Sequence, residues 1–549
     1  MGLSVVRDNR PLSETDSLDN CHFTTNEISV ALSINEAAEW ASKFTNKNVT
    51  PNNITYLIQY GKIQKHHLDG KTSVILKDLQ EYYERYTSGV RDKFEEALGE
   101  DINWDLSFSR VKEAETTKHV QRLHPYKGKF IPQLVEYFLD SHTDNFKREV
   151  YFRQGDVILD PFAGSGTTLV QANELGMHSI GLDISHFNCL IAEAKLEAYH
   201  LESLGERCQE LRRAIESEHD NSGISVLENE LDALLVSVNK RYFPNDYRYK
   251  IAHKEIDETA TSEVAMAKVM QGWKKLLKKY KLLLEARITG SCFLDTWYAA
   301  PVLKEALVAR TMLKQMPEAE KKLLTVLLSR TLRSCRATPH YQLERLEQPI
   351  FEPYYCYKHM KICRPIFSMS DKFARYYKDT LKRIEEFQAI RTDAFNVLLD
   401  SDSRKLDIFS AIRQKNPSFY DLVVKQKIQG IFTSPPYVGQ LDYHEQHEYA
   451  YELFGYTRRD NEEIGKSSRG KGVKAQQDYV RDISDVLINC RKYLADGCHI
   501  FIVANDQHGL YPEIAKRSGL RIVQEFKRPV LNRTSRDKNP YGESIFHMV

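Results

Sequence analysis

The chain has 549 residues, of which 42% are hydrophobic and 28% charged, and this composition is typical of a folded protein with more than one domain. Its formal net charge of +1 excludes a basic surface overall, so any contact with nucleic acid must come from local patches. Nine scattered cysteines indicate reduced thiols, and the lack of an apolar run near the roughly 20 residues of a membrane span predicts a cytosolic protein.

Residues 1–25 are polar and are predicted to be loose, and residues 26–90 predict a small helical unit. Ser33 can cap a first helix, and Thr50 followed by proline can begin a second. Asp69-Gly70 predicts a tight turn between the arms Lys62–Leu68 and Lys71–Leu76. This order resembles the winged helix-turn-helix of excisionase-like and MerR-like DNA-binding domains. A helical packing module remains the alternative.

Residues 115–195 show a pattern in which strands alternate with a helix. Val157–Asp160 and Ser179–Asp183 are short apolar runs that predict strands. Between them, Thr167–Leu175 predicts a helix, which Gly176 ends. A strand, a helix and a strand in this order form the basic unit of a parallel sheet, so this segment is predicted to begin an α/β domain.

Residues 196–390 are mostly helical and charged in pattern, and strands return in residues 391–549. We therefore expect a sheet that begins near residue 157, is interrupted by a large helical insertion, and is completed by a closing antiparallel pair. The later strands are predicted at Phe395–Leu399, Ile428–Thr433, His499–Ala504, Ile522–Phe526 and Ser544–Val549.

The string Asp160-Pro-Phe-Ala-Gly-Ser-Gly-Thr-Thr168 joins the first strand to the next helix. Gly164 and Gly166 allow a tight turn and a close approach of ligand to backbone, and the free amides of a helix N-terminus favour a carboxylate. Asp183, at the end of the second strand, can accept hydrogen bonds from ribose hydroxyls. A nucleotide or dinucleotide site is the alternative, although the absence of Lys-Ser/Thr after the glycines disfavours a P-loop.

The complete string resembles the cofactor motif of amino-methylating DNA methyltransferases. This resemblance implies S-adenosylmethionine as cofactor and a Rossmann-like class I methyltransferase sheet. His124-Pro-Tyr-Lys-Gly-Lys-Phe130 and the segment around Asp402 are similar to two further family segments, which lie at the methionine end and the adenine of the cofactor; an ordinary loop and a solvated turn are the alternatives. The residues expected to bind cofactor are Lys129, Phe130, Asp160, Phe162, Gly164, Gly166, Thr167, Asp183 and Asp402.

The string Ser434-Pro-Pro-Tyr437 directly follows the apolar strand that ends at Thr433. An exocyclic amine of a base is a poor nucleophile, because its lone pair is conjugated into the ring, so a site must hold it with acceptors. The Ser434 side chain and the Pro435 carbonyl can be those acceptors, since Pro435 and Pro436 stiffen the loop and donate no N–H. Tyr437 can stack on a base extruded from the duplex. A surface turn or a polyproline ligand is the alternative.

In the same family, Ser in the first position of this motif usually goes with N4 of cytosine, whereas Asp or Asn goes with N6 of adenine. The following residues resemble a branch of N4-cytosine enzymes, in which Asp442 and Tyr443 are expected to line the base pocket. The resemblance implies a site-specific enzyme of a restriction–modification system that acts on double-stranded DNA in the prokaryotic cytoplasm, at the nucleoid. It also implies a cognate endonuclease on a separate chain. The alternatives are an N6-adenine enzyme, an RNA base methyltransferase and a DNA-binding regulator with an inactive domain.

Local basic patches predict where DNA would be held, because phosphate contacts need cationic side chains. The helical insertion is the expected region of target recognition. The candidate DNA-binding residues are Arg330, Arg333 and Arg336 on one helical face, Lys466, Arg469 and Lys471 in a glycine-containing loop, and Arg533 and Arg536 near the C-terminus. Each patch can also be an ordinary solvated surface.

Two groups of residues have a loose metal-like spacing. His444 and His447 are three positions apart, and Cys356, His359 and Cys363 follow Cys335 and His340. A closed zinc site needs four ligands, usually at tighter and paired spacing, so the sequence predicts no metal site.

Overall fold

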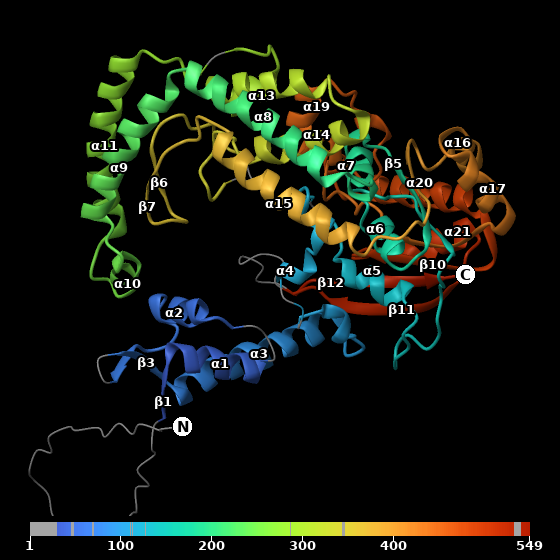
Figure 1. Cartoon of the computed structure of the whole chain (residues 1–549). Helices are drawn as coiled ribbons and strands as arrows, with labels where there is room; N and C mark the ends of the chain where they lie inside the picture. The colour runs from blue at the N-terminus through green and yellow to red at the C-terminus, as the bar shows by residue number, and fades with distance from the viewer. Residues whose placement is uncertain are drawn as a thin grey trace, which may run out of the picture.

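A computed structural model describes residues 30–45, 49–68, 71–109, 111, 113–126, 128–285, 287–342, 346–531 and 540–549. The loose segment predicted at 1–25 and the turn predicted at Asp69-Gly70 lie outside these residues. Figure 1 shows an N-terminal unit, a domain built on a sheet, and a helical insertion that extends away from the sheet. None of the described helices has the length and apolar character that a membrane crossing requires.

A seven-stranded sheet organises the largest domain, with the strand order β11-β12-β10-β9-β4-β5-β8. Its strands are β4 (Val157–Asp160), β5 (His178–Asp183), β8 (Asn396–Asp400), β9 (Ile428–Thr433), β10 (Leu494–Ala504), β11 (Ile522–Pro529) and β12 (Gly542–Met548). Strand β12 runs antiparallel to β10 and β11, and the other neighbours are parallel. The predicted closing antiparallel pair is therefore confirmed, and the sheet fits the predicted Rossmann-like class I methyltransferase fold.

The path of the chain through the sheet creates a switch in strand order. From β4 the chain moves outward through β5 to β8, and it then returns to place β9 on the other side of β4. Ligands of open α/β sheets bind beyond the carboxyl ends of the strands at such a switch. The sequence order therefore brings Asp160 and Thr433, the last residues of β4 and β9, to the same edge of the sheet.

Helices cover both faces of the sheet because its buried strands are apolar on both sides. In β4, Val157 and Leu159 pack into one cluster with residues of α20 and α21, whereas Ile158 packs with Phe138 of α5 on the opposite face. The helices of this domain are α4 (Glu113–Thr116), α5 (Pro132–Leu139), α6 (Thr167–Glu174), α7 (His186–Leu196), α16 (Ile408–Lys415), α17 (Pro417–Gln426), α18 (Tyr443–Gln446), α19 (Glu448–Phe454), α20 (Val473–Arg491) and α21 (Tyr511–Ser518).

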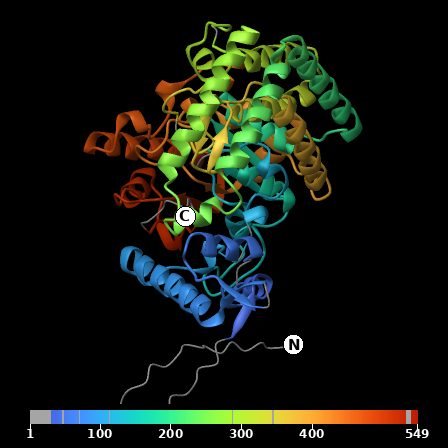
Figure 2. The same cartoon turned by 90° about the vertical axis from the view of Figure 1, so that its left-hand side faces the viewer.

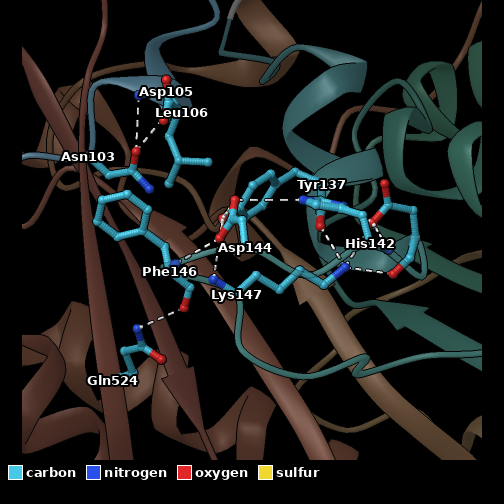
Figure 3. Close-up of polar contacts among 10 residues, drawn as sticks. Asn103, Asp105, Leu106, Tyr137, His142, Asp144, Phe146, Lys147 and Gln524 are labelled. Carbon is cyan, nitrogen blue, oxygen red and sulfur yellow. Dashed lines mark hydrogen bonds and ion pairs between the residues drawn. The ribbon is translucent and has the colours of Figure 1, made fainter.

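The loop that follows α5 is fixed by a buried lysine (Figure 3). The Lys147 ammonium donates to the carbonyls of Tyr137 and Asp140, at 2.8 and 2.6 Å, and to the Asp140 carboxylate at 2.8 Å. Tyr137 in turn donates to Asp144, and Gln524 of β11 donates to the carbonyl of Phe146 at 3.5 Å. These contacts anchor the end of α5 against the sheet edge, and they hold in place the helix that follows the His124–Phe130 segment.

The insertion consists mainly of helices and a small hairpin. Its elements are α8 (Leu201–Asn221), α9 (Ile224–Tyr242), α10 (Tyr247–Ala252), α11 (Glu258–Tyr280), α12 (Cys292–Trp297), α13 (Ala300–Leu313), α14 (Glu318–Arg333), β6 (Tyr354–Cys356), β7 (Lys361–Cys363) and α15 (Ser370–Gln388). The helices α8, α13, α14 and α15 share one apolar cluster with α7, so the insertion is packed onto the sheet domain. Its predicted role in target recognition remains a prediction.

The N-terminal unit combines three helices with a three-stranded antiparallel sheet of order β1-β3-β2. Its elements are β1 (Ala31–Ser33), α1 (Ile34–Thr45), α2 (Pro51–Gln59), β2 (His66–Leu68), β3 (Lys71–Ile75) and α3 (Leu76–Leu98). Thr50 caps α2, and Ser33 accepts a hydrogen bond from the backbone amide of Glu36, as predicted. Figure 2 shows this unit below the rest of the molecule. Its assignment as a winged helix-turn-helix remains a prediction.

Candidate active site

A cavity opens at the switch in strand order, beyond the ends of β4, β5, β8 and β9. It is bordered by residues from the segments that the sequence singled out, although Lys129 and Tyr443 are 443 − 129 = 314 positions apart. The predicted residues that border it are Lys129, Phe130, Asp160, Phe162, Gly164, Thr167, Asp183, Asp402, Ser434, Pro436 and Tyr443.

The glycine loop between β4 and α6 is held against the end of β5. The backbone amide of Gly164 donates to the Asp183 carboxylate at 2.8 Å. A Cβ at Gly164 would lie 2.9 Å from the Tyr126 hydroxyl, so the loop leaves no room for a side chain there. Gly166 has a φ of +78° and precedes the first residue of α6, which explains the second glycine of the motif. Gly166 does not border the cavity, and its role is to shape the loop.

Asp183 lies between the glycine loop and helix α7. Its Oδ2 accepts the hydrogen bond from the Gly164 amide, and its Oδ1 accepts hydrogen bonds from the Ser185 amide at 2.8 Å and from the Asn188 side chain at 3.1 Å. Burial raises the pKa of Asp183 above its ordinary value, although these donors oppose the rise. The carboxylate is therefore oriented within the cavity wall and is preorganised to accept hydrogen bonds.

Asp160 connects the glycine loop to strand β9. Its carboxylate accepts hydrogen bonds from the Thr433 hydroxyl at 2.6 Å and from the Phe162 amide at 3.1 Å. Burial raises the pKa of Asp160 to about 6. The charge on this carboxylate will therefore depend on pH near neutrality and on any cation bound next to it.

The segment before α5 lies over the glycine loop. Tyr126 stacks on Tyr443, with ring centroids 6.2 Å apart, and Phe130 packs on Phe432 at 5.5 Å. Lys129 donates to the Gln121 carbonyl at 2.8 Å, and burial lowers the pKa of its ammonium to about 8. The segment therefore contacts residues of β9 and of the chain after it, and it forms one wall of the cavity.

Asp402 follows β8 and borders the cavity. Burial opposes its ionisation, but hydrogen bonds from the Arg404 guanidinium, at 2.9 Å, and from the Arg404 amide hold the pKa of Asp402 below its ordinary value. Ser401 donates its amide to the Asp183 carbonyl at 3.1 Å, which aligns the two loops. Asp402 is thus an ionised acceptor at the end of the cavity formed by β5 and β8.

The Ser434–Tyr437 motif continues directly from β9. Ser434 and Pro436 border the cavity, and Pro435 is buried behind them. Tyr437 instead borders a separate, smaller cavity, and its hydroxyl donates to Glu543 of β12 at 2.9 Å. Tyr437 was expected to stack on the base, but its ring does not border this cavity. Tyr443 borders the cavity instead, and Tyr437 connects the motif to β12.

Several residues at the cavity were not predicted. Tyr126, Asn188, Glu463 and Ile464 border it. Asn188 could have been found, because it lies one helical turn after the capping residue that follows Asp183. Glu463 accepts hydrogen bonds from both the backbone and the ring of His444, and no local pattern in the sequence indicates this contact. Asp442, which was predicted to line the base pocket, is not among the residues that border this cavity. It lies at the start of α18 with one buried carboxylate oxygen that has no partner among the described residues.

Arg330, Arg333 and Arg336, which were predicted on one helical face, occupy a different environment from the one expected. Arg330 is buried, forms an ion pair with Asp379 at 2.8 Å and lies over the ring of Tyr376. Arg336 is also buried, with its guanidinium 4.6 Å from the ring of Tyr449. The predicted single helical face is wrong for Arg336, because α14 ends at Arg333 and Arg336 lies beyond it, against Tyr449 of α19. Arg330 and Arg336 are buried by packing, so they stabilise the fold and do not present their charges to DNA phosphates. Arg333 is half-buried beside them.

The predicted basic loop lies next to the catalytic motif. Arg469 and Lys471 are exposed and Lys466 is half-buried. The Gly439 amide donates to the Gly465 carbonyl at 3.0 Å, and a Cβ at Gly439 would meet the carbonyl of Gly470 at 2.6 Å. This loop therefore packs directly on the turn that follows Tyr437. Arg533 and Arg536 lie outside the described residues.

Comparisons with known proteins agree with this geometry. A family model described as DNA methylase matches residues 24–194. The type II methyltransferase M.MjaII of Methanocaldococcus jannaschii is 46% identical over 519 residues, which cover 94% of this chain and 96% of that protein. The chain belongs to the type II DNA methyltransferases.

Two other type II methyltransferases match shorter segments. M.BsoBI of Geobacillus stearothermophilus is 39% identical over 88 residues, which is 16% of each chain. M2.DpnII of Streptococcus pneumoniae is 37% identical over 89 residues, which cover 16% of this chain and 31% of that protein. Because these matches are short, the likeness over almost the whole length to M.MjaII is what extends the family assignment to the insertion.

Proposed function

We propose that this methyltransferase transfers a methyl group from S-adenosylmethionine to the exocyclic N4 of a cytosine in double-stranded DNA. The observation that carries the proposal is that Ser434 and Pro436 border the same cavity as Gly164 and Asp183. A base amine held at Ser434 and Pro436 would therefore lie next to a methyl donor held at Gly164 and Asp183. Serine at position 434 favours cytosine over adenine through the family resemblance.

The polar lining of the cavity fits S-adenosylmethionine. The side-chain oxygens of Ser165 and Asn188 are buried at the cavity and have no hydrogen-bond partner among the described residues. A ligand with hydroxyl and ammonium groups would supply the missing donors. Asp183 and Asp402 are the proposed acceptors for the ribose and for the adenine end, and Asp160 lies where a positive charge would favour its ionised form.

The catalytic motif is suited to holding an amine. S-adenosylmethionine supplies an activated methyl group, so the chain needs no covalent intermediate and its task is alignment. The Ser434 hydroxyl oxygen and the Pro435 carbonyl accept the two N–H groups, which turns the nitrogen lone pair toward the donor. The prolines leave no competing N–H in this segment.

The target base must leave the helix to reach this motif. Tyr443 offers a ring at the cavity wall, and stacking of a base on such a ring contributes about 1–3 kcal/mol. The unpartnered carboxylate oxygen of Asp442 is a second candidate contact for the flipped base, since it can accept from an amino group.

Duplex DNA is proposed to lie across the loop that carries Lys466, Arg469 and Lys471, because this loop packs on the catalytic motif. The N-terminal unit is a second proposed contact, with the arrangement of a winged helix-turn-helix. A cognate endonuclease that cuts the same site unless it is methylated is the proposed partner in the cell.

The decisive experiment identifies the modified base. Duplex DNA incubated with the protein and isotopically labelled S-adenosylmethionine is digested to nucleosides and analysed by mass spectrometry. We expect labelled N4-methylcytosine, and labelled N6-methyladenine in its place would refute the cytosine assignment. Adenine is the second candidate, because the matching family model spans N6 and N4 enzymes. Methylation mapping of a host genome that expresses the protein then gives the recognition sequence.

A further inference from the structure

Four potential metal ligands meet at the hairpin of the insertion, far along the chain from the active-site motifs. They are His340, Cys356, His359 and Cys363, and one ligand atom of each lies within 4.8 Å of the ligand atoms of the other three. Cys356 ends β6, Cys363 ends β7, and His359 lies in the turn between the strands. His340 comes from the chain before the hairpin, so the set closes only in the folded protein.

The separations are close to those of a tetrahedral zinc site. Cys356 Sγ lies 3.8 Å from His340 Nδ1, and His359 Nδ1 lies 3.3 Å from Cys363 Sγ. With Zn–S near 2.3 Å and Zn–N near 2.0–2.1 Å, the edges of a ligand tetrahedron measure about 3.4–3.8 Å. No separation among the four ligand atoms exceeds 4.8 Å, so changes in these separations of about 1 Å, within reach of small side-chain rotations, suffice to close the set on one ion.

The backbone around the cluster has the shape of a ligand turn. The amides of His359 and Met360 both donate to the carbonyl of Cys356, at 3.0 and 2.6 Å, and Met360 has a φ of +51°. The Tyr354 hydroxyl lies 3.1 Å from the amide of His340 and accepts its hydrogen bond. These contacts fix the backbones of three ligands before any ion binds.

The types of ligand atom and their burial suit a bound zinc ion. Cys356 is fully buried and Cys363 nearly so, whereas His359 is exposed, so the cluster is accessible from one side. Two thiolates and two neutral imidazoles suit zinc better than harder cations.

We propose that His340, Cys356, His359 and Cys363 bind one zinc ion that holds the β6–β7 hairpin together. With four protein ligands the ion keeps no open position, so its role is structural. Ile362 of β7 packs into the large apolar cluster of the insertion, but the other face of the hairpin has only a very small cluster, made of Tyr354, Cys356 and Cys363 with two partly buried neighbours. A small apolar cluster of this kind gains most from a metal, because metal binding adds directly to folding free energy.

The proposed ion would also stabilise a junction between the insertion and the N-terminal unit. Arg248 of α10 donates to the carbonyl of Lys358 at 3.2 Å, within the ligand turn, and its guanidinium lies 5.4 Å from the ring centre of Tyr60. Tyr60 directly follows α2 of the N-terminal unit. In Figure 1 the hairpin lies beside α9 and α11, and α10 points from them toward α2. The turn thus connects the ligand set to the proposed DNA-binding unit.

The test uses the full-length protein purified without chelators. Elemental analysis is expected to give about one zinc per chain, and the Cys356→Ser/Cys363→Ser double variant is expected to lose it. Cys292→Ser is the matched control, because Cys292 is an exposed thiol of the same insertion that lies outside the ligand set, and it should keep its zinc. Zinc retained by the double variant, or no zinc in wild-type protein after incubation with zinc and desalting, would overturn the proposal.

A second measurement does not depend on the folding of a variant. Wild-type protein produced with cobalt in place of zinc should show the intense visible bands of tetrahedral cobalt together with a thiolate charge-transfer band. Weak visible bands without the charge-transfer band would exclude this ligand set. A Cys356–Cys363 disulfide found by mass spectrometry of the unreduced wild-type protein would likewise refute the site.

Discussion

The hydroxyl of Thr433 donates a 2.6 Å hydrogen bond to the carboxylate of Asp160, across 273 positions of the sequence. Thr433 is the last residue of β9 and directly precedes Ser434, and Asp160 is the last residue of β4 and begins the glycine loop. Both groups are buried, so water does not replace this contact when it is lost. The bond therefore couples the position of the proposed catalytic motif, Ser434–Tyr437, to that of the glycine loop.

Thr433→Val tests this coupling, because valine keeps the branched shape of threonine and removes the hydroxyl. An unsatisfied buried partner costs about 1–3 kcal/mol, so we expect turnover or cofactor affinity to fall by roughly 5- to 100-fold. Steady-state kinetics and calorimetry with S-adenosylmethionine measure the two effects. Thr433→Ser is the control that keeps the donor. A valine variant equal to wild type in both measurements would show that the bond has no functional role.

Ser434→Ala separates the base site from the cofactor site. The alanine variant loses one of the two proposed acceptors of the amine, so turnover should fall by at least about 100-fold, the scale of a lost preorganised hydrogen bond at a reacting centre. Binding of S-adenosylmethionine should stay within about twofold, because Asp183 and Asp402 remain. Ser467→Ala, on the exposed basic loop, serves as the control. Unchanged turnover of Ser434→Ala would refute the assigned role.

The strand pattern of the sheet was predictable because the strands are buried and apolar. Val157–Asp160 and Ile428–Thr433 were predicted with the bounds that the structure has. For β10 the prediction began at His499, whereas the strand begins at Leu494. The register shifts between these two residues, at a polar stretch that a search for apolar runs does not recognise.

The side chains that meet across the fold were less predictable. Arg330 and Arg336 look like surface cations in the sequence. Only the fold shows that Asp379 pairs with Arg330 and that the rings of Tyr376 and Tyr449 cover Arg330 and Arg336. A metal site was not predicted from Cys356, His359 and Cys363, because a closed zinc site usually has four ligands at tighter and paired spacing. The fold brings His340, 16 positions before Cys356, to this group. Local patterns report which face of an element is buried, but they do not report which distant residue packs against it.

Asp160→Asn should change how the stability of the ligand-free protein depends on pH. Burial raises the pKa of Asp160 to about 6 from an ordinary 3.8, so the folded state binds this proton more tightly than the unfolded state. The penalty for ionising the folded protein is absent well below pH 4, grows as pH rises through the window between the two pKa values, and is complete above pH 6. Between pH 7.5 and pH 5 this group adds roughly 1–1.5 kcal/mol of stability as pH falls.

Urea unfolding of wild type and Asp160→Asn at the two pH values measures this contribution, because the other titrating groups are shared and cancel in the comparison. The wild type should gain stability relative to the variant at pH 5. An identical pH dependence of the two proteins would show that Asp160 titrates near its ordinary pKa.

Neutralising the basic loop should weaken binding to DNA without affecting the cofactor. The triple variant Lys466→Gln/Arg469→Gln/Lys471→Gln removes three cations beside the catalytic motif. Each lost phosphate contact reduces the slope of log affinity against log salt by about 0.9. Fluorescence anisotropy over a salt series measures the slope. The control carries the same change of charge on α11, at Lys274, Lys275 and Lys278, which are exposed. Equal slopes in the two variants would exclude the loop as the DNA contact.

The two glycines of the cofactor loop should fail in different ways when each is replaced by alanine. At Gly166 the new Cβ would lie 2.7 Å from the Cβ of Ala192 in α7, in a backbone conformation with φ of +78°. Strain of the positive φ and overpacking together cost about 2–4 kcal/mol, so Gly166→Ala should lower the melting temperature by several degrees. Gly164 also has a positive φ, of +49°, but its new Cβ would lie 2.9 Å from the Tyr126 hydroxyl, so the ring that must shift belongs to the cavity wall and not to the helix α7.

Gly164→Ala should therefore lose cofactor affinity with a smaller loss of stability. The double variant Gly166→Ala/Ala192→Gly separates the steric clash from the backbone strain in Gly166→Ala. Removing the Ala192 methyl restores the space for the new Cβ, while the positive φ at residue 166 remains. We expect it to be more stable than the sum of the two single changes predicts, by about 1–2 kcal/mol, since the two atoms in conflict are direct neighbours. Additive losses would mean that backbone strain alone explains why glycine is required at this position.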